Sequence, residues 1–376
     1  MKLVVAGDFA PITSRIVEQI DNEKFAEMFS LEIVESIKNS DYSIVNFECP
    51  LEGFNAKPIE KNGPALKCSP NTIKAIKYAG FQGVTLANNH VMDQGVEGLE
   101  KTIASCVKLN LDVVGVGKNL EEADNVLIVE RKGEKLAIIN CCEHEFSIAT
   151  EDTPGANPLD PIAQYKQIKE AKGNADFIVV IVHGGHEHFQ LPSPRMKALY
   201  RFFIDAGADA VVNHHQHCYS GYEIYNGKPI VYGLGNFAFD WEGKRASKWN
   251  QGYLVKLDLK SDVEIELIPY EQYGDSASVQ LLNSKESFNS AILKLNGIIV
   301  DDRELKRQTD LFFQSRTSIM KSILEPSQNR WVRSAINRRL LPSMLTKGWI
   351  IKLLNVIDCE AHRDTLLYYL KRYAKD

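Results

Sequence analysis

The stretch GADAVVNHHQHCYSGYEIYNGKPIVYGLGNFAFD, residues 207–240, contains the pattern on which the fold depends. An apolar, β-branched run follows its first glycine and leads directly into the polar cluster NHHQH at 213–217. A second run, residues 228–237, ends in Gly-Asn-Phe. Apolar runs of this length are typical of buried strands, and polar residues just past their ends are typical of a ligand site at the carboxyl edge of a sheet.

The same pattern extends in both directions from this stretch. Over residues 1–270, short apolar runs alternate with segments whose apolar residues recur every three or four positions, which predicts an α/β fold with helices covering a sheet. Helices are expected at 96–110 and 193–207. The segments expected as strands are 2–8, 42–48, 83–89, 111–117, 135–141, 176–184, 208–215 and 228–237, followed by a hairpin of 252–259 and 263–270.

The pattern changes after residue 270, and three parts are expected. Residues 1–270 form the domain that carries the chemistry, 271–283 a polar linker, and 284–376 a C-terminal basic helical region. The whole chain has a formal net charge of -5, but residues after 270 carry 17 Lys and Arg against 12 Asp and Glu. The first 270 residues are therefore strongly acidic, which argues against a nucleic-acid partner.

Composition points to a globular chain, with 44% hydrophobic and 25% charged residues. No apolar run approaches the ~18 residues of a membrane span, and the apolar start of the chain is too short for a signal peptide. Seven cysteines without a pairing pattern indicate reduced thiols, so we expect a cytoplasmic protein. Basic residues alternate with Trp, Leu and Ile over 330–352, which allows peripheral membrane association at most; short helices with solvated basic faces are the favoured alternative.

Polar residues at five predicted strand ends would meet at one rim of the sheet: residues 7–8, 46–48, 88–90, 183 and 214–217. Each alone is also compatible with a helix cap or a hydrogen-bonded core residue. Together they offer carboxylate oxygen from Asp8 and Glu48, amide oxygen from Asn89 and imidazole nitrogen, a set that suits one or two Mn, Fe or Zn ions. In an extended segment, His215 and His217 would point the same way.

The spacing of residues along the sequence indicates two further groups of candidate site residues. His183 follows a strand directly and is the preferred ligand of HGGHEH at 183–188, whereas His186 and His188 are equally compatible with a surface loop. His90 is expected to protonate a leaving oxygen, with Asp93 orienting its ring. Residues 93–95 also fit a simple turn into the next helix. Cys141, Cys142 and Cys218 are expected to be buried, inert thiols.

Four strings, NFECPLE at 46–52, LANNHVMDQGVEGLE at 86–100, HGGHEH and the stretch 207–240, resemble the bacterial capsule-synthesis family typified by CapA, the poly-γ-glutamate synthesis proteins. The resemblance covers about residues 1–270. It implies a metallophosphoesterase-like β-sandwich flanked by helices, similar to the calcineurin-like phosphoesterases, with a C-terminal helical extension.

The resemblance also implies roles for individual residues. It implies metal binding by Asp8, Glu48, Asn89, His183, His215 and His217. His90 with Asp93 would form the catalytic acid. Substrate binding is expected of Glu187, His214 and Asn236.

Departures from the family pattern bear on substrate anchoring more than on metal binding. Ala10 stands where phosphoesterases have a histidine two residues after the first Asp, so one metal loses a nitrogen ligand. Asn213 replaces the usual glycine before the double histidine, and Arg15 is a distant substitute for an arginine that follows the family's first Gly-Asp.

The resemblance predicts a metal-dependent, phosphoesterase-like hydrolase that acts in biosynthesis of an anionic capsule or exopolymer, such as poly-γ-glutamate or a polysaccharide. Its substrate would be an anionic polymer precursor or a phosphoester, and a polymer synthase is a possible partner. Two alternatives remain open: a binding or assembly subunit of such a synthase that retains the fold, and an amide or ester hydrolase or transferase that uses the same metals.

Overall fold

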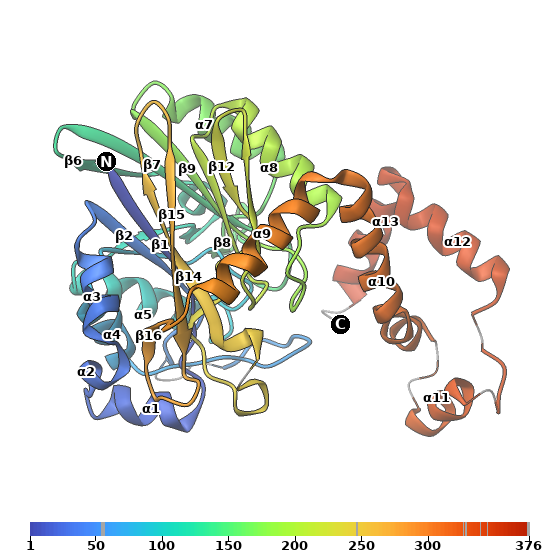
Figure 1. Cartoon of the computed structure of the whole chain (residues 1–376). Helices are drawn as coiled ribbons and strands as arrows, with labels where there is room; N and C mark the ends of the chain where they lie inside the picture. The colour runs from blue at the N-terminus through green and yellow to red at the C-terminus, as the bar shows by residue number, and fades with distance from the viewer. Residues whose placement is uncertain are drawn as a thin grey trace. The chain divides into compact units, whose positions relative to one another are not determined.

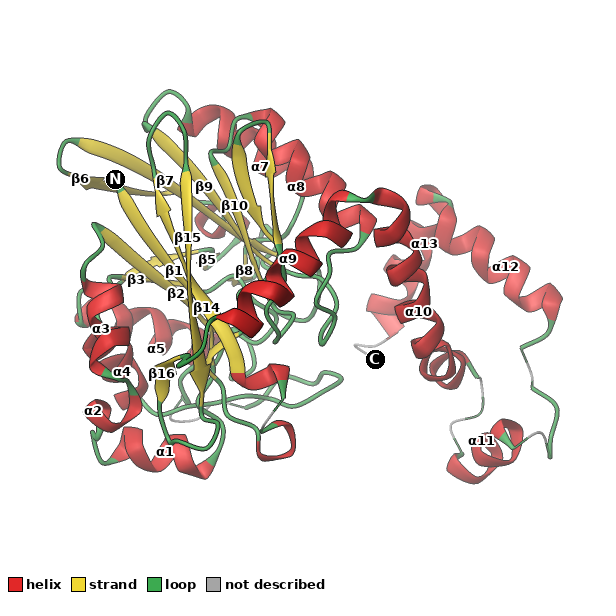
Figure 2. Cartoon of the chain, in the orientation of Figure 1, coloured by secondary structure: helices red, strands yellow, loops and turns green. Residues whose placement is uncertain are grey.

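The computed structural model describes residues 1–53, 57–245, 247–325, 327, 329–338, 340–343 and 345–373. The chain divides into two compact units, Met1–Thr309 and Asp310–Asp376. The first unit consists of two stacked β-sheets with helices on their outer faces (Figures 1 and 2). The α/β sandwich flanked by helices, with further helices toward the C-terminus, confirms the predicted fold class.

In the described residues, the first sheet has eight strands in the order β16-β15-β14-β1-β2-β3-β4, with β13 also paired to β1. Strands β1 to β4 run parallel, whereas β14, β15 and β16 are antiparallel neighbours. The strands are β1 (Lys2–Phe9), β2 (Tyr42–Phe47), β3 (Gly83–Thr85), β4 (Asp112–Val114), β13 (Asn236–Ala238), β14 (Gln251–Asp258), β15 (Glu264–Gln272) and β16 (Val279–Leu281).

The second sheet, again counted over the described ranges, has six strands in the order β11-β12-β10-β9-β7-β6. Its strands are β6 (Leu127–Arg131), β7 (Glu134–Cys142), β9 (Phe177–His183), β10 (Ala210–His214), β11 (Tyr222–Tyr225) and β12 (Lys228–Val231). A short separate pair joins β5 (Val116–Gly117) to β8 (Gly155–Ala156).

Helices cover the outer face of each sheet. The first sheet is covered by α1 (Ser14–Asp21), α2 (Phe25–Met28), α3 (Leu31–Lys38), α4 (Asn71–Ala79) and α5 (Gly95–Lys108). The second is covered by α7 (Pro161–Ala171) and α8 (Pro194–Ala206). The short α6 (Leu120–Ala123), the 3-10 turns η1 (Glu242–Lys244) and η2 (Lys248–Asn250), and α9 (Glu286–Val300) complete the unit. Local capping fixes α8, because Ser193 accepts a hydrogen bond from Met196 N and Gly207 ends the helix at φ +124°.

The apolar runs are continuous because both faces of each sheet are covered. Along β1, Val4 and Ala6 pack toward the helices, whereas Leu3 and Val5 pack between the two sheets. The strands of the second sheet divide in the same way between the inter-sheet core and the core beneath α7 and α8. Alternate residues of each strand thus face opposite cores, and the unit has four layers: helices, sheet, sheet and helices.

Strand register brings the polar strand ends together. In the first sheet, Asp8 lies opposite Asn46 of β2 and opposite Asn236 of β13. In the second sheet, His214 lies opposite His183. Because these pairs are parallel, their carboxyl ends meet at one edge. The predicted rim is therefore present.

Several boundaries differ from the sequence prediction. The strand expected at 83–89 ends at Thr85, because Ala87 N donates to the Asn140 side chain at 2.8 Å instead of continuing the ladder. The run 111–117 splits into β4 and β5 at Gly115, whose φ is +90°. The hairpin of β14 and β15 is confirmed. Residues 271–283, expected as a linker, include the end of β15 and the whole of β16.

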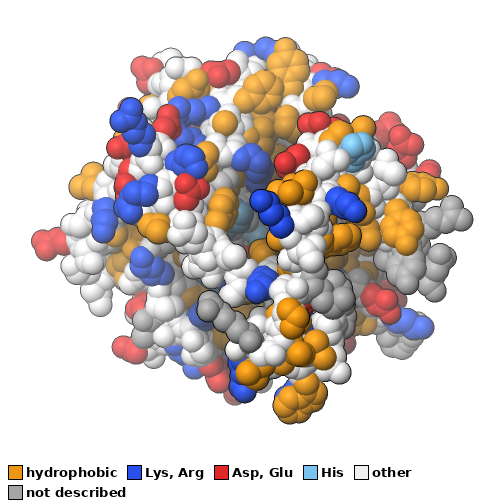
Figure 3. Space-filling model, turned by 90° about the vertical axis from the view of Figure 1, so that its right-hand side faces the viewer, with side chains coloured by type: hydrophobic (Ala, Val, Ile, Leu, Met, Phe, Trp, Pro, Cys, Tyr) orange, Lys and Arg blue, Asp and Glu red, His pale blue; other side chains and the backbone are white. Residues whose placement is uncertain are grey.

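The second unit is helical. It contains most of α10 (Asp302–Leu324), followed by α11 (Arg330–Asn337), α12 (Lys347–Asp358) and α13 (Glu360–Tyr373). Large apolar side chains such as Trp331 are exposed in this unit. Figure 3 shows one face of the whole chain, on which apolar side chains are visible. Arg339 and Met344, within the basic stretch 330–352, lie outside the described residues. Among the described helices, none is both long and apolar enough to cross a bilayer.

Gly7 is the point at which β1 and the loop before β13 approach most closely. Asp8 N donates to Gly235 O at 3.3 Å, and a Cβ at Gly7 would lie 1.8 Å from that same oxygen. The pairing of β1 with β2 also shifts register between Ala6 and Asp8. Only a residue without a side chain fits this contact, so Gly7 sets the position of the aspartate that follows it.

We therefore expect Gly7→Ala to lower the free energy of unfolding by at least ~2 kcal/mol, because the backbone must move to relieve the clash. Gly297→Ala, in α9 where a Cβ meets no atom within 4 Å, is the matched control and should stabilise the chain slightly. Urea unfolding followed by circular dichroism measures both. Equal stability of the two variants would contradict the steric argument.

Candidate metal centre at the strand ends

Five of the predicted ligands converge at the carboxyl edge of the two sheets. Asp8 is the next-to-last residue of β1, Glu48 directly follows β2, His183 ends β9, and His215 and His217 lie in the loop after β10. All five are at most 6% exposed. Side chains from both sheets therefore meet in one buried cluster.

The first group of possible ligands consists of Glu48, His183 and His215. His183 Nε2 lies 3.0 Å from His215 Nδ1 and 3.4 Å from Glu48 Oε1. Asn89 joins this group, because its Oδ1 lies 3.1 Å from the same His183 nitrogen. Burial and the neighbouring imidazoles hold the pKa of His183 well below its usual value. His183 is therefore neutral and keeps the lone pair that a metal requires.

The second group consists of Asp8, Glu48 and His217, whose ligand atoms also lie within 4.8 Å of one another. His217 Nδ1 is 3.5 Å from Asp8 Oδ2, and its Nε2 is 4.0 Å from Glu48 Oε1. Burial alone would lower the pKa of His217, but the Glu48 and Asp8 carboxylates outweigh it and raise the pKa to about 9. The two groups share Glu48, which places that carboxylate between them.

Glu48 is the least satisfied polar group of the cluster. It is 0% exposed, and neither carboxylate oxygen accepts a hydrogen bond from any described residue. Burial and the Asp8 charge raise the pKa of Glu48 well above its usual value. A buried carboxylate without donors is costly unless a cation compensates it. The oxygen and nitrogen donors around it suit Mn, Fe or Zn, so the residues fit one or two divalent ions.

Neighbouring side chains orient the possible ligands. Asn236 Oδ1 lies 2.9 Å from His217 Nδ1, which leaves the other ring nitrogen toward Glu48. Glu145 Oε2 accepts the Asn89 amide proton at 2.9 Å, so that the amide oxygen faces His183. Such partners fix ring and amide orientation in metal sites.

The loop that carries His215 and His217 differs from the expected extended segment. Strand β10 ends at His214, and the φ angles of His215 and His217 are +88° and +54°. These left-handed conformations are unfavourable for residues with a side chain, by about 1 kcal/mol or more each. The two ring centroids lie 6.1 Å apart, and each ring belongs to a different one of the two groups that share Glu48. Both rings face the cluster because of this left-handed backbone, and not because the segment is extended.

His90 and Asp93 form the predicted pair, and a lysine completes it. His90 Nδ1 lies 2.6 Å from Asp93 Oδ2, which also accepts a hydrogen bond from Leu66 N. Lys61 forms an ion pair with the other Asp93 oxygen, and its Nζ is 3.1 Å from His90 Nδ1. Residues 93–95 also form the expected turn into α5. Both interpretations of this segment are therefore compatible with its geometry.

The three predicted substrate-binding residues are placed differently from one another. Glu187 is half-exposed, and the nearby His217 and His215 hold its pKa below the usual value despite partial burial. His214 is buried, and its Nε2 lies 2.9 Å from Ala6 O, so it links the two sheets. Asn236 is buried against His217 and Trp249 O. Only Glu187 is open to solvent, and the positions of the other two support positioning roles.

Sequence reasoning missed three residues that shape this site. Lys61 lies in a loop that no strand end or recurring motif marks, whereas Glu145 lies three residues past the end of β7, a strand-end position that could have indicated it. Trp249 packs its ring 4.8 Å from that of His217 and 5.6 Å from that of His188. His188 thus lies beside the centre, although spacing alone left it as a loop residue.

The cysteines near the rim are buried free thiols. Burial raises the pKa of Cys141 and Cys142, and it raises that of Cys218 to about 12. Such thiols remain protonated and inert near neutral pH. This agrees with the expected structural role of the three residues.

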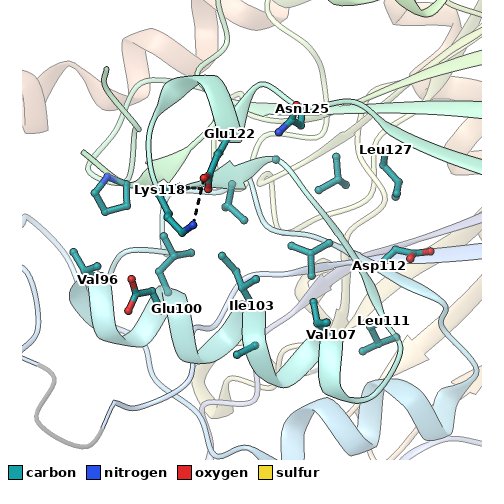
Figure 4. Close-up of a pocket in the computed structure, with 18 of the residues that line it drawn as sticks. Val96, Glu100, Ile103, Val107, Leu111, Asp112, Lys118, Glu122, Asn125 and Leu127 are labelled. Carbon is teal, nitrogen blue, oxygen red and sulfur yellow. Dashed lines mark hydrogen bonds and ion pairs between the residues drawn. The ribbon is translucent and has the colours of Figure 1, made fainter. Parts of the chain in front are cut away.

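A separate pocket of about 1260 Å³ lies between α5 and the segment from β4 to β6. Ile103 and Val107 of α5 face it, and Lys118 pairs with Glu122 at its border (Figure 4). None of the predicted site residues lines it. The groups capable of chemistry are at the strand ends instead.

Residues 2–241 match the family described as bacterial capsule synthesis protein PGA_cap, and the chain belongs to that family. It is 36% identical over 249 residues to the capsule biosynthesis protein CapA of Bacillus anthracis, covering 64% of this chain and 60% of that one. It is also 36% identical over 248 residues to the PGA biosynthesis protein CapA of Bacillus subtilis strain 168, covering 64% and 65% of the two chains.

These matches span about three fifths of the length of the two relatives. Among solved structures, the chain is similar to a protein described as a novel phosphatase from Mycoplasma pneumoniae, with a TM-score of 0.46 and 17% identity. That similarity covers 74% of this chain and 95% of the other.

The Lys61–Asp93 pair yields a test of the His90 surroundings. Lys61→Met should destabilise the chain by about 3 kcal/mol, because it leaves a buried carboxylate without its ion-pair partner. Lys74→Met removes a lysine from an exposed pair with Glu23 and should change stability by less than ~1 kcal/mol. Thermal unfolding compares the two variants. Equal small effects would show that His90 and Leu66 N suffice to hold Asp93.

Proposed function

We propose that this protein is a metal-dependent hydrolase of the phosphoesterase type that acts in the synthesis of an anionic capsule polymer. The observation that carries the proposal is the buried Glu48 carboxylate, which accepts no hydrogen bond from the described residues and is shared by two groups of possible ligands. A buried carboxylate without a hydrogen-bond donor is costly unless a cation binds it, and this supports a metal ion beside Glu48. Membership of the capsule-synthesis family supports the biological setting.

Asp8, Glu48, Asn89, His183, His215 and His217 would hold one or two divalent ions. A divalent ion bound there would supply Lewis-acid activation of the substrate and of water. Neutral His183 offers an unprotonated nitrogen, and Asn236 and Glu145 keep His217 and Asn89 in their binding orientations. The chain thereby holds its ligands in place before an ion binds.

His90 is proposed as the general acid. Its Nδ1–H donates to Asp93 Oδ2, so Nε2 is the nitrogen that can deliver a proton to the leaving oxygen. Asp93 holds the ring at its Nδ1 side, and Lys61 holds Asp93 through an ion pair with the other carboxylate oxygen. Loss of the ring would remove proton transfer without removing any proposed ligand.

A binding or assembly subunit of a polymer synthase is the second candidate. One observation favours it: the group Asp8, Glu48 and His217 contains a single nitrogen donor, and buried Ala10 stands where phosphoesterases have another. The same site could also serve amide or ester hydrolysis. The substrate proposed for the hydrolase is an anionic polymer precursor or a phosphoester, with the synthase as its partner.

Metal content and turnover test the proposal together. Purified wild type should contain Mn, Fe or Zn in a ratio near one or two per chain and should hydrolyse a phosphomonoester or phosphodiester of a test panel. His217→Ala should lose metal, and His90→Ala should keep metal while turnover falls by about 10²-fold or more. His362→Ala, in the second unit, is the matched control.

The alternatives give different results in the same experiment. Metal binding without phosphoester turnover, combined with cleavage of amide or ester substrates, would identify the other hydrolase. No metal and no turnover after metal supplementation would overturn the hydrolase proposal and favour the assembly subunit.

Glu48→Gln tests two things: whether the buried Glu48 charge destabilises the metal-free protein, and whether stabilisation by Mn²⁺ requires that charge. In EDTA the variant should be more stable than wild type, because the neutral amide no longer opposes Asp8 in a buried site. Mn²⁺ should raise the melting temperature of wild type but not that of the variant. Glu52→Gln, at an exposed pair with Lys67, should match wild type in both conditions. Destabilisation of Glu48→Gln in EDTA would show that the protein alone satisfies this carboxylate.

A further inference from the structure

A second pocket, of about 680 Å³, adjoins the proposed metal centre. It lies between residues 188–191, Lys244, residues 247–249 and α9, and His217 and Cys218 form part of its wall. The pocket is therefore continuous with a proposed metal ligand, unlike the apolar pocket beside α5.

The lining of this pocket is basic. Lys244, Lys248 and Lys294 contribute to it, and none of the described residues that line it is Asp or Glu. Lys248 Nζ donates to the neutral Gln190 side chain, and the described residues offer no carboxylate partner to the three amines. Three ammonium groups without counter-charges form a local positive site on a domain that is acidic as a whole.

Helix α9 is held firmly as one wall of the pocket. Lys197 of α8 is buried, and its Nζ donates to Ile299 O at 2.5 Å and pairs with Asp302 at 2.7 Å. Tyr222 N donates to the Asn296 side chain at 2.7 Å. Phe288 packs edge-on against Tyr253. Lys294 is thus presented from a fixed helix.

The opposite wall connects the pocket to the metal centre. Trp249 is 3% exposed and donates its indole proton to Phe239 O at 2.6 Å, so its ring is fixed. The same ring packs on both His217 and His188. A substrate group in the pocket would rest on Trp249 while the adjoining group reaches His217.

We infer that this pocket, here called the lysine pocket, binds a second anionic group of the substrate, a carboxylate or a phosphate, next to the group that is cleaved. The inference rests on the proposed function for its link to catalysis. Lys244, Lys248 and Lys294 all lie beyond residues 2–241, the part that matches the family. The lysine pocket therefore combines walls from the matched part with lysines that lie beyond it, and it would favour substrates with two or more negative groups over those with one.

Binding to the full chain in EDTA tests the lysine pocket without requiring metal or turnover. Inorganic pyrophosphate and tricarballylate serve as the phosphate and carboxylate probes in isothermal titration calorimetry. The double variant Lys248→Gln/Lys294→Gln should bind about tenfold more weakly than wild type, the loss of two exposed charge contacts. Raised salt should weaken wild-type binding further.

The matched control is Lys166→Gln/Lys285→Gln, which removes two exposed lysines outside the pocket, one of them at the start of α9. It should bind both probes as wild type does. Tighter binding of one probe identifies the phosphate or the carboxylate as the preferred anion. Equal affinity of wild type and Lys248→Gln/Lys294→Gln, or no binding of either probe, would overturn the inference.

Catalysis gives a separate readout. Once a substrate that the protein hydrolyses has been identified, kinetics can be compared. Lys248→Gln/Lys294→Gln should raise KM for a doubly charged substrate and leave kcat unchanged, because the lysines contact no reacting atom. A failure of the hydrolase proposal would leave the titration in EDTA unaffected. The two proposals therefore fail in distinguishable ways.

Discussion

The burial of one carboxylate without a hydrogen-bond donor is the constraint around which this structure is arranged. Glu48 directly follows β2, and the imidazoles of His183 and His217 lie 3.4 Å and 4.0 Å from its Oε1. Neither imidazole donates a hydrogen bond to this buried carboxylate, so without a bound cation stability is given up at the place where chemistry is proposed. The left-handed backbone at His215 and His217 adds to that cost.

Much of the first unit could be predicted because its strands are buried on both faces. Continuous apolar runs marked β1, β2, β9 and β10, and parallel pairing then placed Asp8 and His183 at one edge. The loops could not be predicted in the same way. Lys61 reaches Asp93 from a segment without periodicity, and the left-handed turn at His215 depends on tertiary contacts that no local pattern encodes.

Two pockets show why volume alone does not locate function. The pocket beside α5 is the larger of the two but offers apolar side chains and an already paired Lys118. The smaller lysine pocket shares His217 with the proposed metal centre. Position relative to groups capable of chemistry, combined with uncompensated charge, distinguishes a binding site from a gap in packing.

The buried amine of Lys197 has a consequence for the extent of the first unit. Its two partners, Ile299 O and the Asp302 carboxylate, lie some sixty residues past the end of the family match at residue 241. A polypeptide cut after β15 would lose β16 from the first sheet, the whole of α9 and both partners of the Lys197 amine. The packing of the first unit therefore continues past residue 241, through α9 and into the start of α10.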